Sequence, residues 1–219
     1  MGYSKKMTSL LTGATPNQLE SWRKSGLVRP EVRNDRPPLW SFRDLVLLRS
    51  VAYLRSQLSS QKIHKGFDHL RELQQVEFAP DVAGAAFAHP SEYEFGTDGR
   101  TIFLGTPGGE GYDLLKKVTA SGAQPMLFPA SVMLEAFSNF KGSEVAPLRA
   151  PSKYLELDPG RMGGVPTIVG TRVPFDVIAR LVDYKTVFPG DVSNFYPSVS
   201  PAAAEDARAF SDRIESVAG

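Results

Sequence analysis

The stretch that most constrains the fold runs from residue 15 to residue 28, and it predicts a short capped helix followed by a sharp exit. Thr15 suits the N-cap position, and the proline after it suits the first helical position, where an N–H has no intrahelical partner. Leu19 and Trp22 lie three positions apart, so both can point into the same core. Gly26 can adopt the left-handed conformation that ends a helix.

The neighbouring segments extend this helix into a larger module. Residues 7–13 predict a short helix that closes at a glycine, and two short helices joined by a tight turn form a helix-turn-helix. Residues 27–40 hold three arginines and three prolines, and we expect a two-strand wing with a basic tip there. Ser41 and Asp44 predict a capped start for a long helix, and another helix is expected over about residues 60–73.

This order of helix, turn, helix, wing and long helix resembles the MerR-type winged helix-turn-helix family. The matching residues are Ala14, Thr15, Gln18, Leu19, Gly26, Leu27 and the stretch from Arg36 to Leu45. The resemblance covers about a third of the chain and implies that the second helix enters the major groove of DNA while the wing contacts the backbone. One position departs from the family pattern, because Glu20 stands where the family usually has arginine.

The charge distribution also favours a nucleic-acid partner. Residues 1–75 contain 13 Lys and Arg residues against 6 Asp and Glu residues, a net charge of +7 in a chain whose total is +1. A basic surface of this kind suits a phosphate backbone, and its binding weakens as salt rises. Three polar side chains are expected to face outward and reach bases or phosphates: Asn17, Gln18 and Ser21. Six basic side chains are expected to hold phosphates: Arg23, Lys24, Arg29, Arg33, Arg36 and Arg43.

The middle of the chain, residues 76–150, predicts a small β-rich segment that joins the two ends and supports dimerisation. Residues 93–105 predict two strands around an Asp-Gly turn. Residues 131–140 predict a short amphipathic helix, and residues 142–151, with one glycine and two prolines, predict a linker. The glycine-rich residues 106–111 lack the Gly-Lys-Ser/Thr ending of a phosphate-binding loop, so we interpret them as an ordinary loop.

The C-terminal stretch predicts a small helical module. Residues 154–169 predict two short strands around a Gly-Gly turn, Pro174 opens a helix, and Ser200 caps a last helix that runs to about Val217. This stretch resembles a small family of bacterial helix-turn-helix-like modules over about 60 residues. The matching residues are Gly163, Gly164, Pro166, Ile168, Gly170, Thr171, Arg172, Val173, Pro174, Tyr196, Pro197 and Ser200.

Members of that family commonly occur as the antitoxin half of toxin–antitoxin pairs, beside a PIN-like ribonuclease toxin. Together with the MerR-like N-terminus, the resemblance implies a VapB-type antitoxin that binds its toxin and its operator DNA. The acidic, metal-binding active site of such a toxin attracts cations, and guanidinium groups pair bidentately with carboxylates. The candidate arginines for that contact are Arg161, Arg172, Arg208 and Arg213. For Arg172 a structural role within its Gly-Thr-Arg turn is the alternative.

We therefore predict an α+β protein, mainly helical. It has a winged helix-turn-helix over residues 1–75, a β-rich middle over 76–150 and a helix-turn-helix-like module over 151–219. Its predicted function is that of a type II antitoxin, acting as a homodimer in a cytoplasmic toxin–antitoxin complex, with no enzymatic activity and no cofactor. No apolar run approaches the ~20 residues needed to cross a bilayer. His64 and His69 are five apart on one predicted helix and do not share a face, so no metal site is predicted.

Two other classes of function remain open at this point. One is a ligand-responsive MerR-type transcription regulator without a toxin partner. Its dimerising helix would need residues 44–75, whose apolar pattern is interrupted at Ser59 and Ser60, and the lack of cysteine argues against thiol-based metal sensing. The other is a protein-interaction scaffold whose helix-turn-helix no longer reads DNA, which Glu20 would fit.

Overall fold

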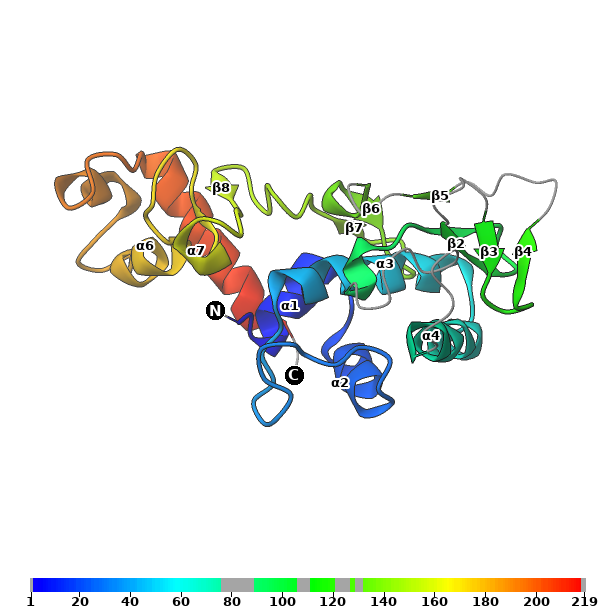
Figure 1. Cartoon of the computed structure of the whole chain (residues 1–219). Coiled ribbons are helices and arrows are strands. Elements are labelled where there is room, and N and C mark those ends of the chain that lie inside the picture. The colour runs from blue at the N-terminus through cyan, green and yellow to red at the C-terminus, as the bar shows by residue number, and fades with distance from the viewer. Residues whose placement is uncertain (1, 76–88, 106–110, 121–126, 129–131, 218–219) are drawn as a thin grey trace.

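The computed structural model describes residues 2–75, 89–105, 111–120, 127–128 and 132–217, and it shows an α+β chain (Figure 1). The α-helices are α1 (Lys5–Thr12), α2 (Pro16–Lys24), α3 (Phe42–Gln57), α4 (Ser60–Gln75), α6 (Phe175–Leu181) and α7 (Pro201–Ser216). The 3₁₀ helices are η1 (Pro90–Glu92), η2 (Val132–Leu134), η3 (Met162–Gly164) and η4 (Pro189–Asn194). The strands are β1 (Phe95–Thr97), β2 (Ile102–Gly105), β3 (Gly111–Asp113), β4 (Val118–Ala120), β5 (Leu127–Phe128), β6 (Phe137–Ser138), β7 (Glu144–Val145), β8 (Leu155–Glu156) and β9 (Thr167–Ile168).

The helix-turn-helix forms from local capping interactions. Thr15 Oγ1 accepts the N–H of Gln18 at 3.2 Å, and the Gln18 side chain accepts the N–H of Thr15 at 2.9 Å, which closes a capping box at the start of α2. Gly13 and Gly26 have φ values of 72° and 74°, so each ends its helix in the left-handed conformation. Ser41 begins α3 with a second capping box. The predicted helices and caps of this region are confirmed.

The predicted two-strand wing is wrong. In residues 27–40, all of which the structure describes, no strand is assigned; one isolated antiparallel pair joins Arg33 to Leu39 within the segment, and a second joins Trp40 to Tyr3. The backbones of Arg33 and Leu39 exchange two hydrogen bonds, of 3.1 and 2.8 Å. Pro37 and Pro38 lie between Arg33 and Leu39 and have no N–H to continue a ladder. The segment is therefore a projecting loop, which we call the arginine loop, residues 27–40.

The middle of the chain builds a five-stranded antiparallel sheet in the order β4-β3-β2-β1-β5. The predicted hairpin over residues 93–105 is confirmed, with Gly99 at a φ of 78° in its turn. Phe67 of α4 stacks on Phe95 of β1 with ring centroids 5.4 Å apart, so α4 packs against the sheet. The predicted glycine-rich loop lies outside the described residues, apart from Gly111, which begins β3.

A buried arginine holds the next segment to the helical core. The Arg49 side chain is 0% exposed and donates to four backbone carbonyl groups, those of Leu11, Met133, Glu135 and Ala146. The Leu11 carbonyl belongs to α1, and the other three belong to residues 133–146, which follow Arg49 by 84 to 97 positions. Burial lowers the pKa of Arg49 to about 10, so the group still carries its charge at neutral pH.

This arrangement overturns two predictions. Residues 131–140 do not form an amphipathic helix, because their described part contains only the single turn η2 and the short strand β6. Two carbonyls of this segment point to Arg49 and are lost to any helical ladder. Residues 142–151 are not a plain linker either, since β7 pairs with β6 there and Leu148 is fully buried.

The C-terminal module follows its predicted local pattern. Ser200 Oγ accepts the N–H of Ala203 at 3.2 Å and caps α7, whose inward residues include Phe210. Phe175 of α6 meets Phe210 edge-on at 5.0 Å between ring centroids. The stretch between these helices holds η4, a 3₁₀ helix. Residues 155 and 168 pair in a two-stranded sheet, β8 with β9.

The two ends of the chain meet in space. Helix α7 contacts α1, and Lys6 Nζ lies 3.0 Å from a carboxylate oxygen of Glu215 (Figure 1). The Tyr3 hydroxyl donates to the Gly164 carbonyl at 2.6 Å. One cluster of buried apolar side chains continues from Tyr3 to Ile214, so the terminal modules share a core. Within the described ranges, no helix has both the length and the apolar character required for a membrane span.

We expect Arg49→Met to lower the free energy of unfolding by about 3 kcal/mol or more, because four buried or partly buried carbonyls lose this donor. Urea titration followed by circular dichroism measures the change. Arg55→Met, on the same helix, removes one carbonyl contact and serves as the control, with a loss of about 1 kcal/mol or less. Equal losses in the two variants would contradict the role assigned to Arg49.

Candidate nucleic-acid interface

One face of α2 is free of core contacts. Asn17, Ser21 and Lys24 are exposed and lie at spacings of four and three residues, so they share this face. Leu19 and Trp22 point the other way and are buried at 1% and 4% exposure, which confirms their predicted place in the core. The exposed face of α2 therefore offers an amide, a hydroxyl and an ammonium group, although the Lys24 Nζ atom also lies 3.5 Å from a carboxylate oxygen of Glu20.

Two of the predicted contact residues on α2 are held within the protein. The carbonyl oxygen of the Gln18 side chain accepts the Thr15 N–H, as part of the capping box. Arg23 contacts both oxygens of Glu20, at 2.9 and 3.3 Å, and donates to the Asn34 carbonyl at 3.1 Å. The hydrogen bond from Arg23 lowers the pKa of Glu20 to about 2. Arg23 thus fastens the arginine loop to α2 rather than presenting its charge outward.

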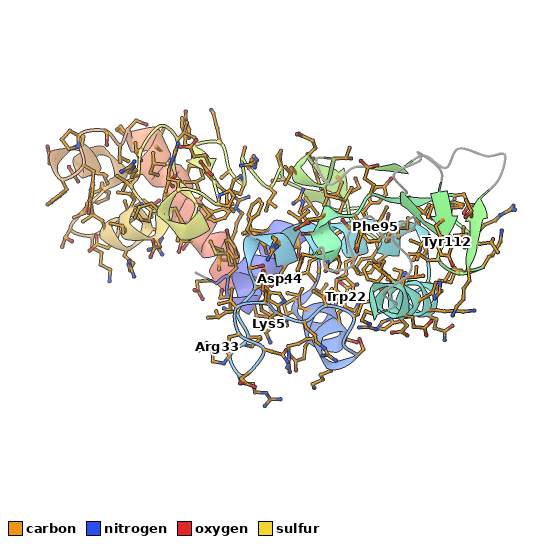
Figure 2. All side chains as sticks on the ribbon, in the orientation of Figure 1. Lys5, Trp22, Arg33, Asp44, Phe95 and Tyr112 are labelled. Atoms are coloured by element: carbon orange, nitrogen blue, oxygen red, sulfur yellow. The ribbon has the colours of Figure 1, made fainter. Side chains whose placement is uncertain are left out.

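The arginine loop carries its basic side chains on the surface beside α2. Arg29, Arg33 and Arg36 are all exposed, and Figure 2 shows Arg33 on the part of the loop that projects from the body. The Nε of Arg33 donates to the Pro37 carbonyl at 2.8 Å, which braces the loop from inside. Arg29 and Arg36 have no hydrogen-bond or ion-pair partner among the residues that the structure describes, so their charges are available.

Arg43, unlike Arg29 and Arg36, is paired with carboxylates of the protein. Its guanidinium donates to Glu31 at 2.6 Å and to Glu92 at 3.3 Å, and these two carboxylates raise its pKa. The side chain is half exposed, but its charge is matched inside the protein. The structure therefore places Arg43 as a link between the arginine loop and η1, away from the role predicted for it.

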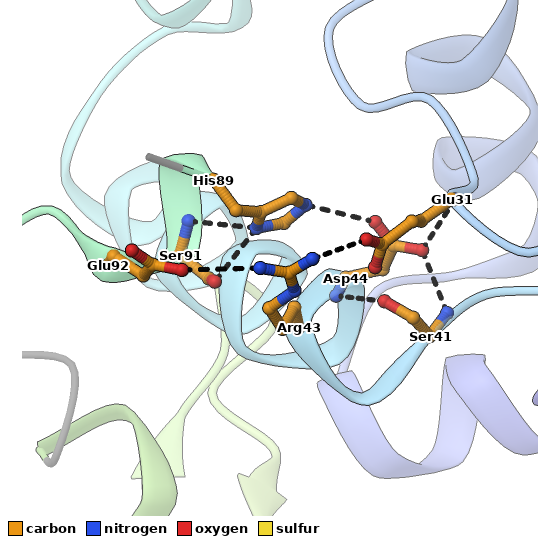
Figure 3. Close-up of polar contacts among 7 residues, drawn as sticks. All are labelled: Glu31, Ser41, Arg43, Asp44, His89, Ser91 and Glu92. Atoms are coloured by element: carbon orange, nitrogen blue, oxygen red, sulfur yellow. Dashed lines mark hydrogen bonds and ion pairs between the residues drawn. The ribbon is translucent and has the colours of Figure 1, made fainter. Parts of the chain in front are cut away.

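A polar cluster lies at the base of the arginine loop (Figure 3). The Asp44 Oδ2 atom accepts the N–H groups of Glu31 and Ser41, each at 2.8 Å. The other oxygen, Oδ1, is buried without a hydrogen-bond donor among the described residues, and His89 Nε2 lies 3.5 Å from it. The His89 Nδ1 atom lies 2.8 Å from Ser91 Oγ and 3.2 Å from the Ser91 N–H.

We define the metal-ligand cluster as Glu31, Asp44 and His89, whose nearest ligand atoms all lie within 4.8 Å of one another. Sequence reasoning missed it, because His89 lies 45 positions after Asp44 and no motif spacing connects the two. The two histidines of α4 are separate from it. The Nε2 atom of His64 lies 2.8 Å from Ser25 Oγ, and the ring of His69 stacks on Tyr112 of β3.

Three of the four arginines predicted to contact a toxin are engaged within the C-terminal module. Arg208 donates to the carbonyls of Ala179 and Val182, both at 3.3 Å, and so caps the end of α6. Arg213 donates to Ser152 Oγ at 2.9 Å. Arg161 forms an ion pair with Glu156 of β8.

Arg172 differs from these three. It has no hydrogen bond or ion pair to any residue in the described part of the chain. Together with Arg161, Asp158 and Met162 it lines a surface hollow of about 380 Å³. Met162 is 46% exposed, and Val169 on the neighbouring turn is 52% exposed. A free guanidinium flanked by exposed apolar groups is an arrangement typical of protein interfaces.

Comparison with known proteins gives one match. The model of a family described as "Protein of unknown function (DUF433)" matches residues 155–211, from β8 into α7. No curated protein and no solved structure matches the chain. The matched region coincides with the C-terminal module and covers about a quarter of the chain, a typical size for one compact unit.

We expect Arg208→Ala to lower the free energy of unfolding by about 1–2 kcal/mol, because two carbonyls at the end of α6 lose their donor. Arg172→Ala should change it by no more than about 0.5 kcal/mol, since its side chain has no described partner. Thermal and urea unfolding of the two variants measure this difference. A loss as large for Arg172 as for Arg208 would assign Arg172 a structural role.

Proposed function

We propose that this protein is a type II antitoxin. In this proposal it binds operator DNA through α2 and the arginine loop, and it neutralises a PIN-like ribonuclease toxin through its C-terminal module, working as a homodimer in the cytoplasm. The observation that carries the proposal is a capped helix-turn-helix whose exposed helix face lies beside a loop with available arginines. The resemblance of the C-terminal module to an antitoxin family, joined to a MerR-like N-terminus, supports the same function.

The DNA-binding part is supported by charge and exposure. Ser21 and Lys24 lie on the exposed face of α2, where a recognition helix makes base and phosphate contacts. Arg29 and Arg36 extend the positive surface along the loop. Arg23 holds the loop against α2, so the helix and the loop are presented to a partner as one surface.

The toxin-binding part is supported by Arg172. A PIN-like ribonuclease collects carboxylates around its metal ions, and a free guanidinium can pair with them bidentately. Arg172 is the candidate whose charge is not matched within the described residues, whereas Arg208 and Arg213 brace the module from inside. We therefore narrow the proposed contact to Arg172 and its neighbours in the hollow.

The main alternative is the ligand-responsive regulator without a toxin. A cleft of about 600 Å³ favours it, because this cleft lies between the end of α2 and α4 and has Phe67 and Leu70 in its wall. The long dimerising helix of such regulators is not present in residues 42–75. Leu58 is extended there and separates α3 from α4, and most of α3 is buried within the chain. We therefore place the antitoxin function first.

The first test of DNA binding is fluorescence anisotropy with the DNA upstream of the gene, over a series of salt concentrations. Lys24→Gln and Arg36→Gln should each weaken binding for all sequences and reduce the slope of log K against log salt by about 1. Lys185→Gln serves as the control, because it removes an equal charge from an exposed site in the C-terminal module. Salt-independent binding, or no binding, would overturn the DNA-binding part.

The test of toxin binding is co-expression with the neighbouring open reading frame, followed by size-exclusion chromatography and a ribonuclease assay. We expect a stable complex in which ribonuclease activity is suppressed. Arg172→Ala should weaken the complex by roughly ten-fold or more, in the range of an interfacial arginine. Arg180→Ala, an exposed arginine paired with Asp176, is the matched control. The absence of both a complex and a ribonuclease would leave the regulator alternative.

A further inference from the structure

The metal-ligand cluster, Glu31, Asp44 and His89, has the composition and spacing of a metal-ion site (Figure 3). We propose that it binds one divalent transition-metal ion, with Zn²⁺ as the representative case. Through the ion, the arginine loop would be fastened to the start of α3 and to η1. This site is additional to the DNA and toxin surfaces, and its test depends on neither of them.

The first argument is the incomplete bonding of Asp44. Its side chain is 0% exposed, and Oδ2 receives two backbone N–H groups while Oδ1 receives none from the described residues. A buried carboxylate oxygen without a donor is costly, because no hydrogen bond replaces the hydration that it loses on burial. Oδ1 points toward His89, which is where an ion would restore the lost interaction.

The second argument is distance. Asp44 Oδ1 and His89 Nε2 are 3.5 Å apart, which is beyond the ~2.7–3.2 Å range of a good hydrogen bond. Zinc lies about 2.0–2.2 Å from its nitrogen and oxygen ligands, and two ligands at a tetrahedral angle are then about 3.4 Å apart. The observed separation therefore fits two ligands of one ion better than a direct contact.

The third argument is the surroundings of the histidine. Ser91 Oγ lies 2.8 Å from Nδ1, so Nδ1–H can donate to it and leave the Nε2 lone pair facing the carboxylates. Metal-binding histidines are usually held by such a bond from their other nitrogen. In the opposite tautomer, Nδ1 accepts the Ser91 N–H at 3.2 Å and Nε2 carries a proton. That tautomer needs no ion, and the experiment below separates the two.

The fourth argument is charge. Glu31, Asp44 and Glu92 bring three negative charges to this region, and Arg43 brings one positive charge. With a neutral imidazole the group has an excess of two negative charges, which one divalent cation balances. Glu31 has a side chain that is 38% exposed, so an ion can reach the cluster from solvent. Nitrogen and oxygen ligands in this ratio suit Zn²⁺ and its neighbours in the transition series.

The experiment is isothermal titration of the full chain with Zn²⁺ after treatment with a chelator. We expect one saturable site, and we expect His89→Asn to weaken it at least about ten-fold, as the loss of a ligand does. Asparagine can still accept the Ser91 N–H but is too short to reach the ion. Glu31→Gln gives a second variant. It leaves the α3 cap in place, because that cap is formed by Ser41 and Asp44, and it keeps the backbone N–H of residue 31 that donates to Asp44. The control is His64→Asn, which should leave Zn²⁺ binding unchanged.

Limited trypsin digestion gives an independent readout. Arg33 is the one arginine of the arginine loop that is not followed by proline, so cleavage of this loop after an arginine reports on that bond. Zn²⁺ should slow this cleavage in the parent chain and have no effect in His89→Asn. Absence of saturable binding, or binding that both ligand variants retain, would overturn the proposal. In that case the His89 ring is in the tautomer with its N–H at Nε2, which faces Asp44 without an ion between them.

Discussion

The buried guanidinium of Arg49 is the interaction on which the rest of the structure depends. It forms no ion pair with a carboxylate of the described residues, and its hydrogen bonds go to backbone carbonyls of α1 and of residues 133–146. A charge is costly to bury unless its hydrogen-bond donors have acceptors. The surrounding chain must therefore keep these four carbonyls directed at Arg49. In that arrangement β6, paired with β7, lies against α3, and the centroid of the Phe137 ring lies 4.8 Å from the guanidinium carbon.

The position of α1 explains how one chain can join two surfaces. Helix α1 packs on α2 and α3 within the helix-turn-helix and also contacts α7 of the C-terminal module. The Tyr3 hydroxyl adds a hydrogen bond to Gly164, and burial raises its pKa to about 12, so the phenol stays protonated. On the proposed function, the DNA surface and the toxin surface therefore belong to one shared core.

The arginine loop shows how charged residues divide between structure and binding. Arg23 and Arg43 have carboxylate partners and fix the two sides of the loop, whereas Arg29 and Arg36 lack partners in the described chain. The proposed metal ion would act on the same loop through Glu31. Side-chain contacts of Arg23 and Arg43 thus fix this loop, because its prolines limit the backbone ladder that a wing normally has.

The sequence by itself determined the elements whose cause is local. The caps at Thr15, Ser41 and Ser200 and the left-handed stop at Gly26 depend on neighbours within a few residues, so reading the sequence predicted them correctly. The tertiary structure alone decided which charged side chains have no partner in the described chain and which segments do not form the helix that their local pattern predicts. Residues 131–140 have a helical apolar pattern, but two of their carbonyls are taken by Arg49. The metal-ligand cluster likewise exists because packing brings together side chains that are far apart in the chain, and no local pattern records such a contact.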